Sequence, residues 1–226
     1  MPVYLDEQMI GLASDVIGFP HLLLCLGFVA LTEDVNGDHD ISGIHLTDIA
    51  ASKRAFPFFV SELNKGGPPA KINAIYGCCN RSIRYPGITN TTTAWRAEMT
   101  EYAALLGFKG PARGFDTSII APRDGTYVEY QLSRTGGREI RIYYRRNEKM
   151  DYGGGGANLG QVMFSDSTVP EALRNNPKVL AKIKDRIELA ASKGSATVRP
   201  KKFTGKARTL TEVDYSLRLD EQYVHF

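Results

Sequence analysis

The stretch FPHLLLCLGFVALTEDVNGDHDISGIHL, residues 19–46, decides the fold of this chain. It holds two apolar runs, 19–31 and 41–46, separated by a polar segment rich in Asp, Asn and Gly. Apolar runs of this kind between turn-forming residues are typical of buried β-strands. The first run carries Cys25 and the second carries His45. The sequence therefore predicts that a sheet begins the fold and bears a thiol and an imidazole.

Cys25 and His45 are candidates for nucleophilic chemistry. A thiol attacks poorly while it is protonated, and an adjacent imidazole makes the thiolate available at neutral pH. The pair could therefore perform acyl chemistry, with Cys25 as the nucleophile. A buried cysteine can equally serve as a small apolar residue of the core, and this alternative stays open.

Strands and helices are expected on both sides of this stretch. We predict strands at 9–13, 22–31, 41–46 and 71–76, a helix capped at Thr47-Asp48, a second helix at 94–106 and a hairpin within 117–146. Pro57 should kink or split the first helix. The predicted fold class is α/β, with a layered mixed sheet and flanking helices over residues 1–150. Residues 151–226 are expected to add a Gly-rich linker, a helix over 169–192 and a basic C-terminal extension.

Composition limits the classes of function. The 226 residues include 42% hydrophobic ones and carry a formal charge of +3, which is too small to indicate a nucleic-acid partner for the whole chain. The three cysteines form neither a disulfide framework nor a structural zinc motif, so no cofactor is expected and synthesis in a reducing cytoplasm is indicated. The sequence shows no secretory signal and no apolar run of membrane-spanning length.

The order of these elements resembles the chemoreceptor glutamine deamidases of bacterial chemotaxis. It is similar, more distantly, to the catalytic domains of cytotoxic necrotizing factor toxins. The resemblance covers roughly residues 8–146 and is carried by Cys25 after a Leu-rich strand, by Ser42-Gly43-Ile44-His45 one strand later and by Gly77.

The sequence departs from the pattern of the family directly before the nucleophile and again six residues upstream of it. Leu23-Leu24 stand where the family has Gly-Ser or Ser-Gly before the nucleophile, and Phe19 stands where a threonine is expected. The loop that would bind the oxyanion and the third catalytic group therefore need to be found in the structure.

The resemblance implies a bacterial hydrolase that deamidates glutamine side chains of a target protein. Cys25 would attack the amide, and His45 would protonate the departing ammonia and then activate water. Thr47 is the candidate for the group that orients His45, with Asp48 and Thr32 as alternatives. Such a protein would be an effector or toxin that acts in virulence, exported without a signal peptide into a host or target cell.

The polar segment between the two strands suggests a second function. Asp34, Asn36, Asp38 and Asp40 follow the spacing of oxygen ligands in a calcium loop. Against this, His39 replaces the glycine of the sharp turn and His45 replaces the bidentate glutamate at position twelve. The alternative function is a non-enzymatic binding module with this loop, and the simpler interpretation is an acidic hairpin turn.

Three further features have simpler explanations. Cys78-Cys79 are expected to be core residues at the end of a strand. The glycines at 153–156 lack the residues of a phosphate-binding loop and are expected to form a connection. The tract 193–208 has six basic residues and no acidic one, so it could bind nucleic acid, although a solvated linker is sufficient explanation. The sequence does not indicate an oligomeric state or a specific target.

Overall fold

The computed structural model describes residues 3–5, 7, 9–64, 67–118, 123, 125–133 and 139–146, together with the backbone of short strands at 162–163, 211–212 and 223–225. For residues 139, 145 and 146 only the backbone is described. The predicted helix at 169–192, the glycines at 153–156 and the basic tract at 193–208 lie outside the described residues. The division of the chain near residue 150 stays a prediction.

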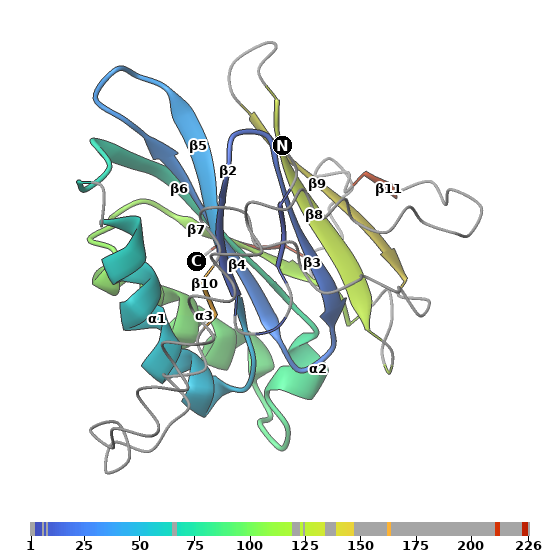
Figure 1. Cartoon of the computed structure of the whole chain (residues 1–226). Helices are drawn as coiled ribbons and strands as arrows, with labels where there is room; N and C mark the ends of the chain where they lie inside the picture. The colour runs from blue at the N-terminus through green and yellow to red at the C-terminus, as the bar shows by residue number, and fades with distance from the viewer. Residues whose placement is uncertain are drawn as a thin grey trace, which may run out of the picture.

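The described part of the chain forms two mixed β-sheets and a few helices, which confirms the α/β class (Figure 1). The five-stranded sheet has the order β1-β3-β8-β9-β11, with bounds Val3–Tyr4, Val16–Leu22, Thr126–Ser133, Glu139–Arg146 and Thr211–Glu212. The seven-stranded sheet has the order β10-β2-β5-β4-β6-β7-β12, with bounds Val162–Met163, Met9–Ala13, His39–Leu46, Leu26–Glu33, Lys71–Cys79, Ala112–Asp116 and Tyr223–His225. The helices are α1 (Ile49–Leu63), α2 (Arg81–Arg84) and α3 (Thr91–Leu105).

The elements stack in three layers, and the seven-stranded sheet is the middle one. Figure 1 shows α1 and α3 on one side of this sheet and β3, β8 and β9 on the other. Alternate residues of β4 divide between two cores, as the two-residue period of a strand requires. Val29 and Leu31 pack between the sheets, whereas Phe28 and Ala30 pack against the helices. The middle sheet is therefore buried on both faces, which explains its nearly continuous apolar strands.

The helical layer is held by aromatic side chains. The ring of Phe56 on α1 stacks on Tyr102 of α3, with ring centroids 4.0 Å apart, and Phe28 of β4 meets both rings edge-on. Helix α1 begins at the predicted place, because Asp48 accepts a hydrogen bond from the Ala51 amide at 2.9 Å. Pro57 lies inside α1 without splitting it. The buried Phe56 and its neighbours hold both halves of the helix against the sheet.

The predicted strand at 22–31 is wrong in one respect that matters for the site. Strand β3 ends at Leu22 and β4 begins at Leu26, so the chain turns between them and passes from one sheet to the other. His21 takes a left-handed backbone conformation at this point, with φ 55°. The side chains of Leu23 and Leu24 are exposed. The apolar sequence at 22–31 therefore contains a turn as well as a strand, and Cys25 lies in that turn.

Candidate functional site

Cys25 and His45 lie near the same end of two neighbouring strands. Gly27 of β4 is paired with His45 of β5, and Leu26 with Leu46. Cys25 is two residues before Gly27, in the turn that leads into β4, and its side chain packs in the core between the two sheets, where the His45 ring meets Phe19. Both side chains are buried between the two sheets, Cys25 with 3% and His45 with none of its surface exposed. The structure therefore places the two predicted residues as near neighbours in the inner core.

The hydrogen bond of the Cys25 thiol goes to Glu7 and not to His45. Its Sγ donates to Oε1 of Glu7 at 3.3 Å. Burial raises the pKa of the Cys25 thiol well above its usual value, and the charge and hydrogen bond of Glu7 raise it further, while the positive charge of Arg84 opposes them. At neutral pH the thiol is therefore protonated in this conformation, in contrast to the thiolate that the sequence led us to expect.

His45 is oriented by the main chain of the same N-terminal segment. Its Nδ1 lies 2.7 Å from the carbonyl oxygen of Leu5. Because a carbonyl oxygen only accepts hydrogen bonds, Nδ1 carries the proton and Nε2 is the basic nitrogen of the neutral ring. The ring also meets Phe19 edge-on, with centroids 5.8 Å apart. A backbone carbonyl and a packed ring together fix the direction of the imidazole.

The residues predicted as the third group make other contacts. The carbonyl of Thr47 accepts a hydrogen bond from Arg84, and Asp48 caps α1. Thr32 is near the opposite end of β4, where its hydroxyl donates to the carbonyl of Asp40 at 3.2 Å. The Leu5 carbonyl occupies the position next to Nδ1. Sequence reasoning missed it because a main-chain oxygen leaves no mark on the amino-acid pattern.

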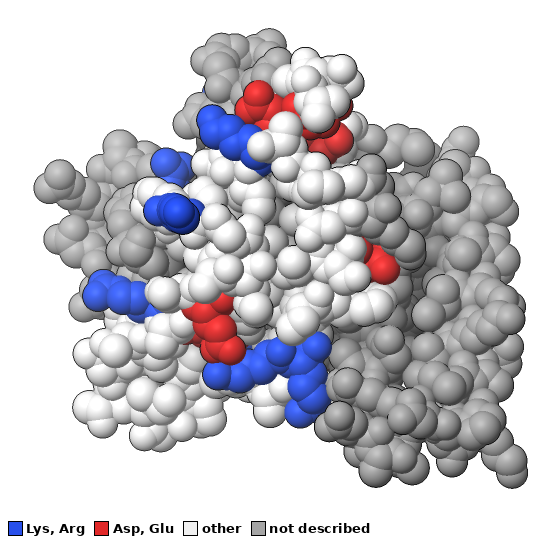
Figure 2. All heavy atoms as spheres, turned by 90° about the vertical axis from the view of Figure 1, so that its left-hand side faces the viewer, with Lys and Arg blue, Asp and Glu red and all other residues white. Residues whose placement is uncertain are grey.

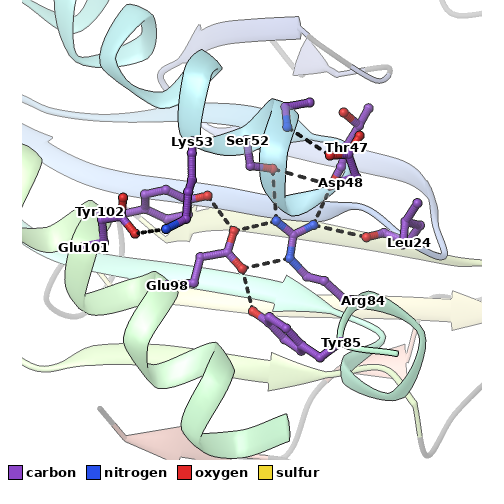
Figure 3. A network of polar contacts seen from close by, with 11 residues as sticks. Leu24, Thr47, Asp48, Ser52, Lys53, Arg84, Tyr85, Glu98, Glu101 and Tyr102 are labelled. Atoms are coloured by element: carbon purple, nitrogen blue, oxygen red, sulfur yellow. Dashed lines mark hydrogen bonds and ion pairs between the residues drawn. The ribbon is translucent and has the colours of Figure 1, made fainter. Parts of the chain in front are cut away.

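A buried cluster of polar residues joins the two segments that carry Cys25 and His45 (Figure 3). We call it the Arg84 cluster, and it consists of Arg84, Tyr85, Glu98, Tyr102 and Ser52. Nη1 of Arg84 donates to the carbonyl of Leu24 at 3.1 Å and to the carbonyl of Thr47 at 2.5 Å. Leu24 precedes Cys25 and Thr47 follows His45 by two residues. One side chain therefore holds the turn before β4 against the end of β5.

All five N–H donors of Arg84 are used. Besides the two carbonyls, Nε and Nη2 donate to the two carboxylate oxygens of Glu98 at 2.9 and 2.5 Å, and Nη2 donates to the hydroxyl of Ser52 at 3.0 Å. The planar guanidinium is suited to this fork, and only 1% of the Arg84 surface is exposed. A lysine could not reproduce the arrangement, because it has three donors that diverge from a single nitrogen.

Glu98 accepts hydrogen bonds from two tyrosines as well as from Arg84. The hydroxyls of Tyr85 and Tyr102 each donate to its carboxylate at 2.5 Å. Burial raises the pKa of Glu98, but the hydrogen bonds and charge of Arg84 and the two hydroxyls outweigh it, and the net shift is downward. Burial also raises the pKa of both tyrosines, and the nearby Glu98 charge adds to that. Glu98 is therefore ionised and the tyrosines remain neutral donors.

The acidic segment between β4 and β5 forms a hairpin turn. Oδ1 of Asp34 accepts the backbone amides of Asn36 and Asp38, each at 2.8 Å, and Oδ2 accepts the side-chain amide of Asn36 at 3.2 Å. These bonds, the Asp38 amide first, lower the pKa of Asp34. Within the described ranges no group of three or more His, Cys, Asp or Glu could hold a metal ion. Asp34, the first residue of the predicted calcium loop, therefore uses its carboxylate to stabilise the hairpin turn.

Cys78 and Cys79 end β6 in the core, as predicted. Neither side chain is exposed, and Sγ of Cys78 lies 3.5 Å from the carbonyl of Gly27. Burial raises the pKa of Cys78 to about 12 and the pKa of Cys79 well above its usual value. These two thiols are therefore unsuited to act as nucleophiles.

The face of the molecule drawn in Figure 2 does not form one basic field. Figure 2 views the molecule from the side where α1 and the β4–β5 turn lie, and the basic side chains stand in separate groups with acidic ones between them. No helix of the described residues is long and apolar enough to cross a membrane. The charges drawn on this face therefore do not indicate a nucleic-acid interface.

The geometry gives the chain a candidate site built from Cys25, His45, the N-terminal segment and the Arg84 cluster. Its residues come from five separate parts of the sequence, 5–7, 24–25, 45–52, 84–85 and 98–102. No protein-family model matches the sequence, and no curated protein matches it.

Proposed function

We propose that the chain is a cysteine-dependent amidohydrolase that deamidates glutamine side chains of a target protein, in the manner of a bacterial effector or toxin. One observation supports this above the others. Arg84 ties the carbonyl beside Cys25 to the carbonyl two residues beyond His45, so the turn that carries Cys25 and the end of the strand that carries His45 are held together. Preorganisation of this kind is what a nucleophile and its base require.

The reaction proceeds through a thioester. Nε2 of His45 takes the thiol proton once a side-chain rotation of Cys25 transfers its hydrogen bond from Glu7 to His45. The thiolate attacks the amide carbon, and the C–N bond breaks as His45 returns the proton to the departing ammonia. Water then attacks the thioester carbon, with His45 taking a proton from it. The carboxylic acid leaves and the Cys25 thiol is restored. The Leu5 carbonyl keeps the Nδ1 proton in place throughout.

The first experiment measures ammonia release from unfolded casein and from an end-blocked glutamine dipeptide. Wild type and Cys78→Ala should release ammonia, whereas Cys25→Ser and His45→Ala should not. Because Cys78 is buried against Gly27, its variant controls for a general effect of losing a thiol. Ammonia release that survives Cys25→Ser would contradict the mechanism.

A second measurement does not depend on the choice of substrate. Alkylation of Cys25 in native Glu7→Ala, with Cys78 and Cys79 replaced, should be faster than in the same protein with His45→Ala. A Cys25 that reacts only after unfolding in every variant would make it a core residue. The burial and raised pKa of Cys25 favour a second candidate function, a non-enzymatic binding module in which Cys25 is only a core residue.

A further inference from the structure

The N-terminal segment makes two contacts with the site, and they differ in kind. Leu5 is fully buried and its amide donates to the carbonyl of Gly18 at 2.8 Å, which continues the parallel pairing of β1 with β3. Its carbonyl, next to His45, is therefore fixed by the fold. Glu7 lies in the connection between β1 and β2 and is exposed. Its contact with Cys25 depends on the side chain alone and can be replaced without disturbing a strand.

The chemical group that Glu7 presents to the thiol is informative. Its carboxylate oxygen accepts the hydrogen bond of the Cys25 thiol at 3.3 Å, so the carboxyl carbon one bond further on lies beside the sulfur that would attack a substrate amide carbon. A glutamate side chain is what remains after a glutamine has been deamidated. Glutamine has the same carbon skeleton and differs only by an amino group in place of one oxygen.

We propose that Glu7 occupies the position of the substrate side chain and acts as a product-like occupant supplied by the chain itself. This inference rests on the proposed function and specifies its substrate. The substrate is a glutamine whose side chain projects from an exposed turn of a protein, as the side chain of Glu7 projects from the connection between β1 and β2. It must displace Glu7 before its amide reaches Cys25.

The decisive variant is Glu7→Gln, which turns the occupant into a substrate. Cys25 should attack the amide of the new side chain, ammonia should leave with a proton from His45, and water should release a glutamate at position 7. The N-terminal peptide, isolated after proteolysis, should then show the mass of glutamate instead of glutamine. Because the side chain is exposed, the substitution should leave the fold intact.

Three controls assign the conversion to the site. Glu7→Gln combined with Cys25→Ser or with His45→Ala should retain glutamine. Glu101→Gln places a glutamine at an exposed position of α3 beside Lys53, where it should also persist.

Glu7→Ala should deamidate the end-blocked glutamine dipeptide about tenfold faster than wild type, the factor expected when a competing hydrogen bond to a charged group is removed.

The outcomes separate this inference from the proposed function. Conversion at position 7 that requires Cys25 supports both. A glutamine that persists at position 7 overturns the inference, whatever the dipeptide assay shows. If wild type still deamidates the dipeptide through Cys25, the proposed function stands without it. If no variant releases ammonia and Cys25 of Glu7→Ala reacts only after unfolding, the function fails as well.

Discussion

The guanidinium of Arg84 and the carboxylate of Glu98 meet through two parallel hydrogen bonds, 2.9 Å from Nε to Oε2 and 2.5 Å from Nη2 to Oε1. The pair lies between the helices and the seven-stranded sheet, and hardly any of its surface is exposed. Two charges in such a place are stable only together, because either one alone would be buried without compensation. The stability of the chain and the geometry of the candidate site therefore depend on the same contact.

Replacement of Arg84 should destabilise the fold severely. Arg84→Met leaves Glu98 buried without its partner, for which a loss of about 3–5 kcal/mol in the free energy of unfolding is expected. Arg96→Met on the exposed face of α3 is the matched control and should change stability by less than about 0.5 kcal/mol. Urea unfolding followed by circular dichroism gives both values. Equal stabilities of the two variants would show that the cluster contributes little.

Acid should weaken the protein through Glu98. Its pKa lies below the usual 4.5 in the folded state, so the unfolded chain binds the proton more readily. The stabilisation is fully present above the unfolded pKa and is lost as the pH falls through the folded pKa. Unfolding free energies between about pH 6 and pH 3 should therefore decline, and Glu98→Gln should decline less steeply from a lower starting value.

A control separates Glu98 from the hairpin turn. Asp34 also has a lowered pKa and titrates in the same direction. The variant Asp34→Asn should keep most of the acid dependence that Glu98→Gln loses. If Asp34→Asn instead removed it, the turn and not the buried cluster would be the acid-sensitive element.

The three cysteines should be protected in the native wild type. Burial raises the pKa of all three thiols, and Glu7 adds to the effect at Cys25. Iodoacetamide at neutral pH should therefore modify the folded protein slowly and the unfolded protein at three positions, as the intact mass will show. Rapid native labelling of Cys78 or Cys79 would contradict their placement in the core.

Gly27 should not tolerate a side chain. A Cβ there would lie 2.7 Å from the ring of Phe19 and 2.8 Å from Sγ of Cys78. Gly27→Ala should cost about 1–3 kcal/mol in unfolding free energy, as overpacking of a core usually does. Gly77→Ala is a fitting comparison, since its Cβ would meet the thioether of Met99, which can move aside. The loss at Gly77 should be the smaller one.

Much of the fold could be predicted because it follows local patterns. The strands 9–13 and 41–46, the Asp48 cap and the helix carrying Trp95, Met99 and Tyr102 are all found where the alternation of apolar residues indicated them. The turn at Cys25 could not be predicted, because Leu23 and Leu24 are apolar although they are exposed. Hydrophobicity alone does not distinguish a buried strand from an exposed turn.

The site was predicted only in part for a different reason. Cys25 and His45 are recognisable by their chemistry, and the sheet brings them near each other. Their partners come from distant segments: a backbone oxygen at Leu5, a carboxylate at Glu7 and an arginine from a four-residue helix. Such contacts arise from tertiary packing, which no local pattern of the sequence encodes.

The way Arg84 binds its neighbours also affects how distant relatives could be recognised. It contacts Leu24 and Thr47 only through their carbonyl oxygens, so those two positions can change without loss of the contact. Glu98 and the tyrosine next to Arg84 contribute side-chain atoms and cannot change so freely. A homologue that keeps this architecture should thus be marked by an Arg-Tyr pair with a glutamate fourteen positions after the arginine, more than by the residues around its cysteine.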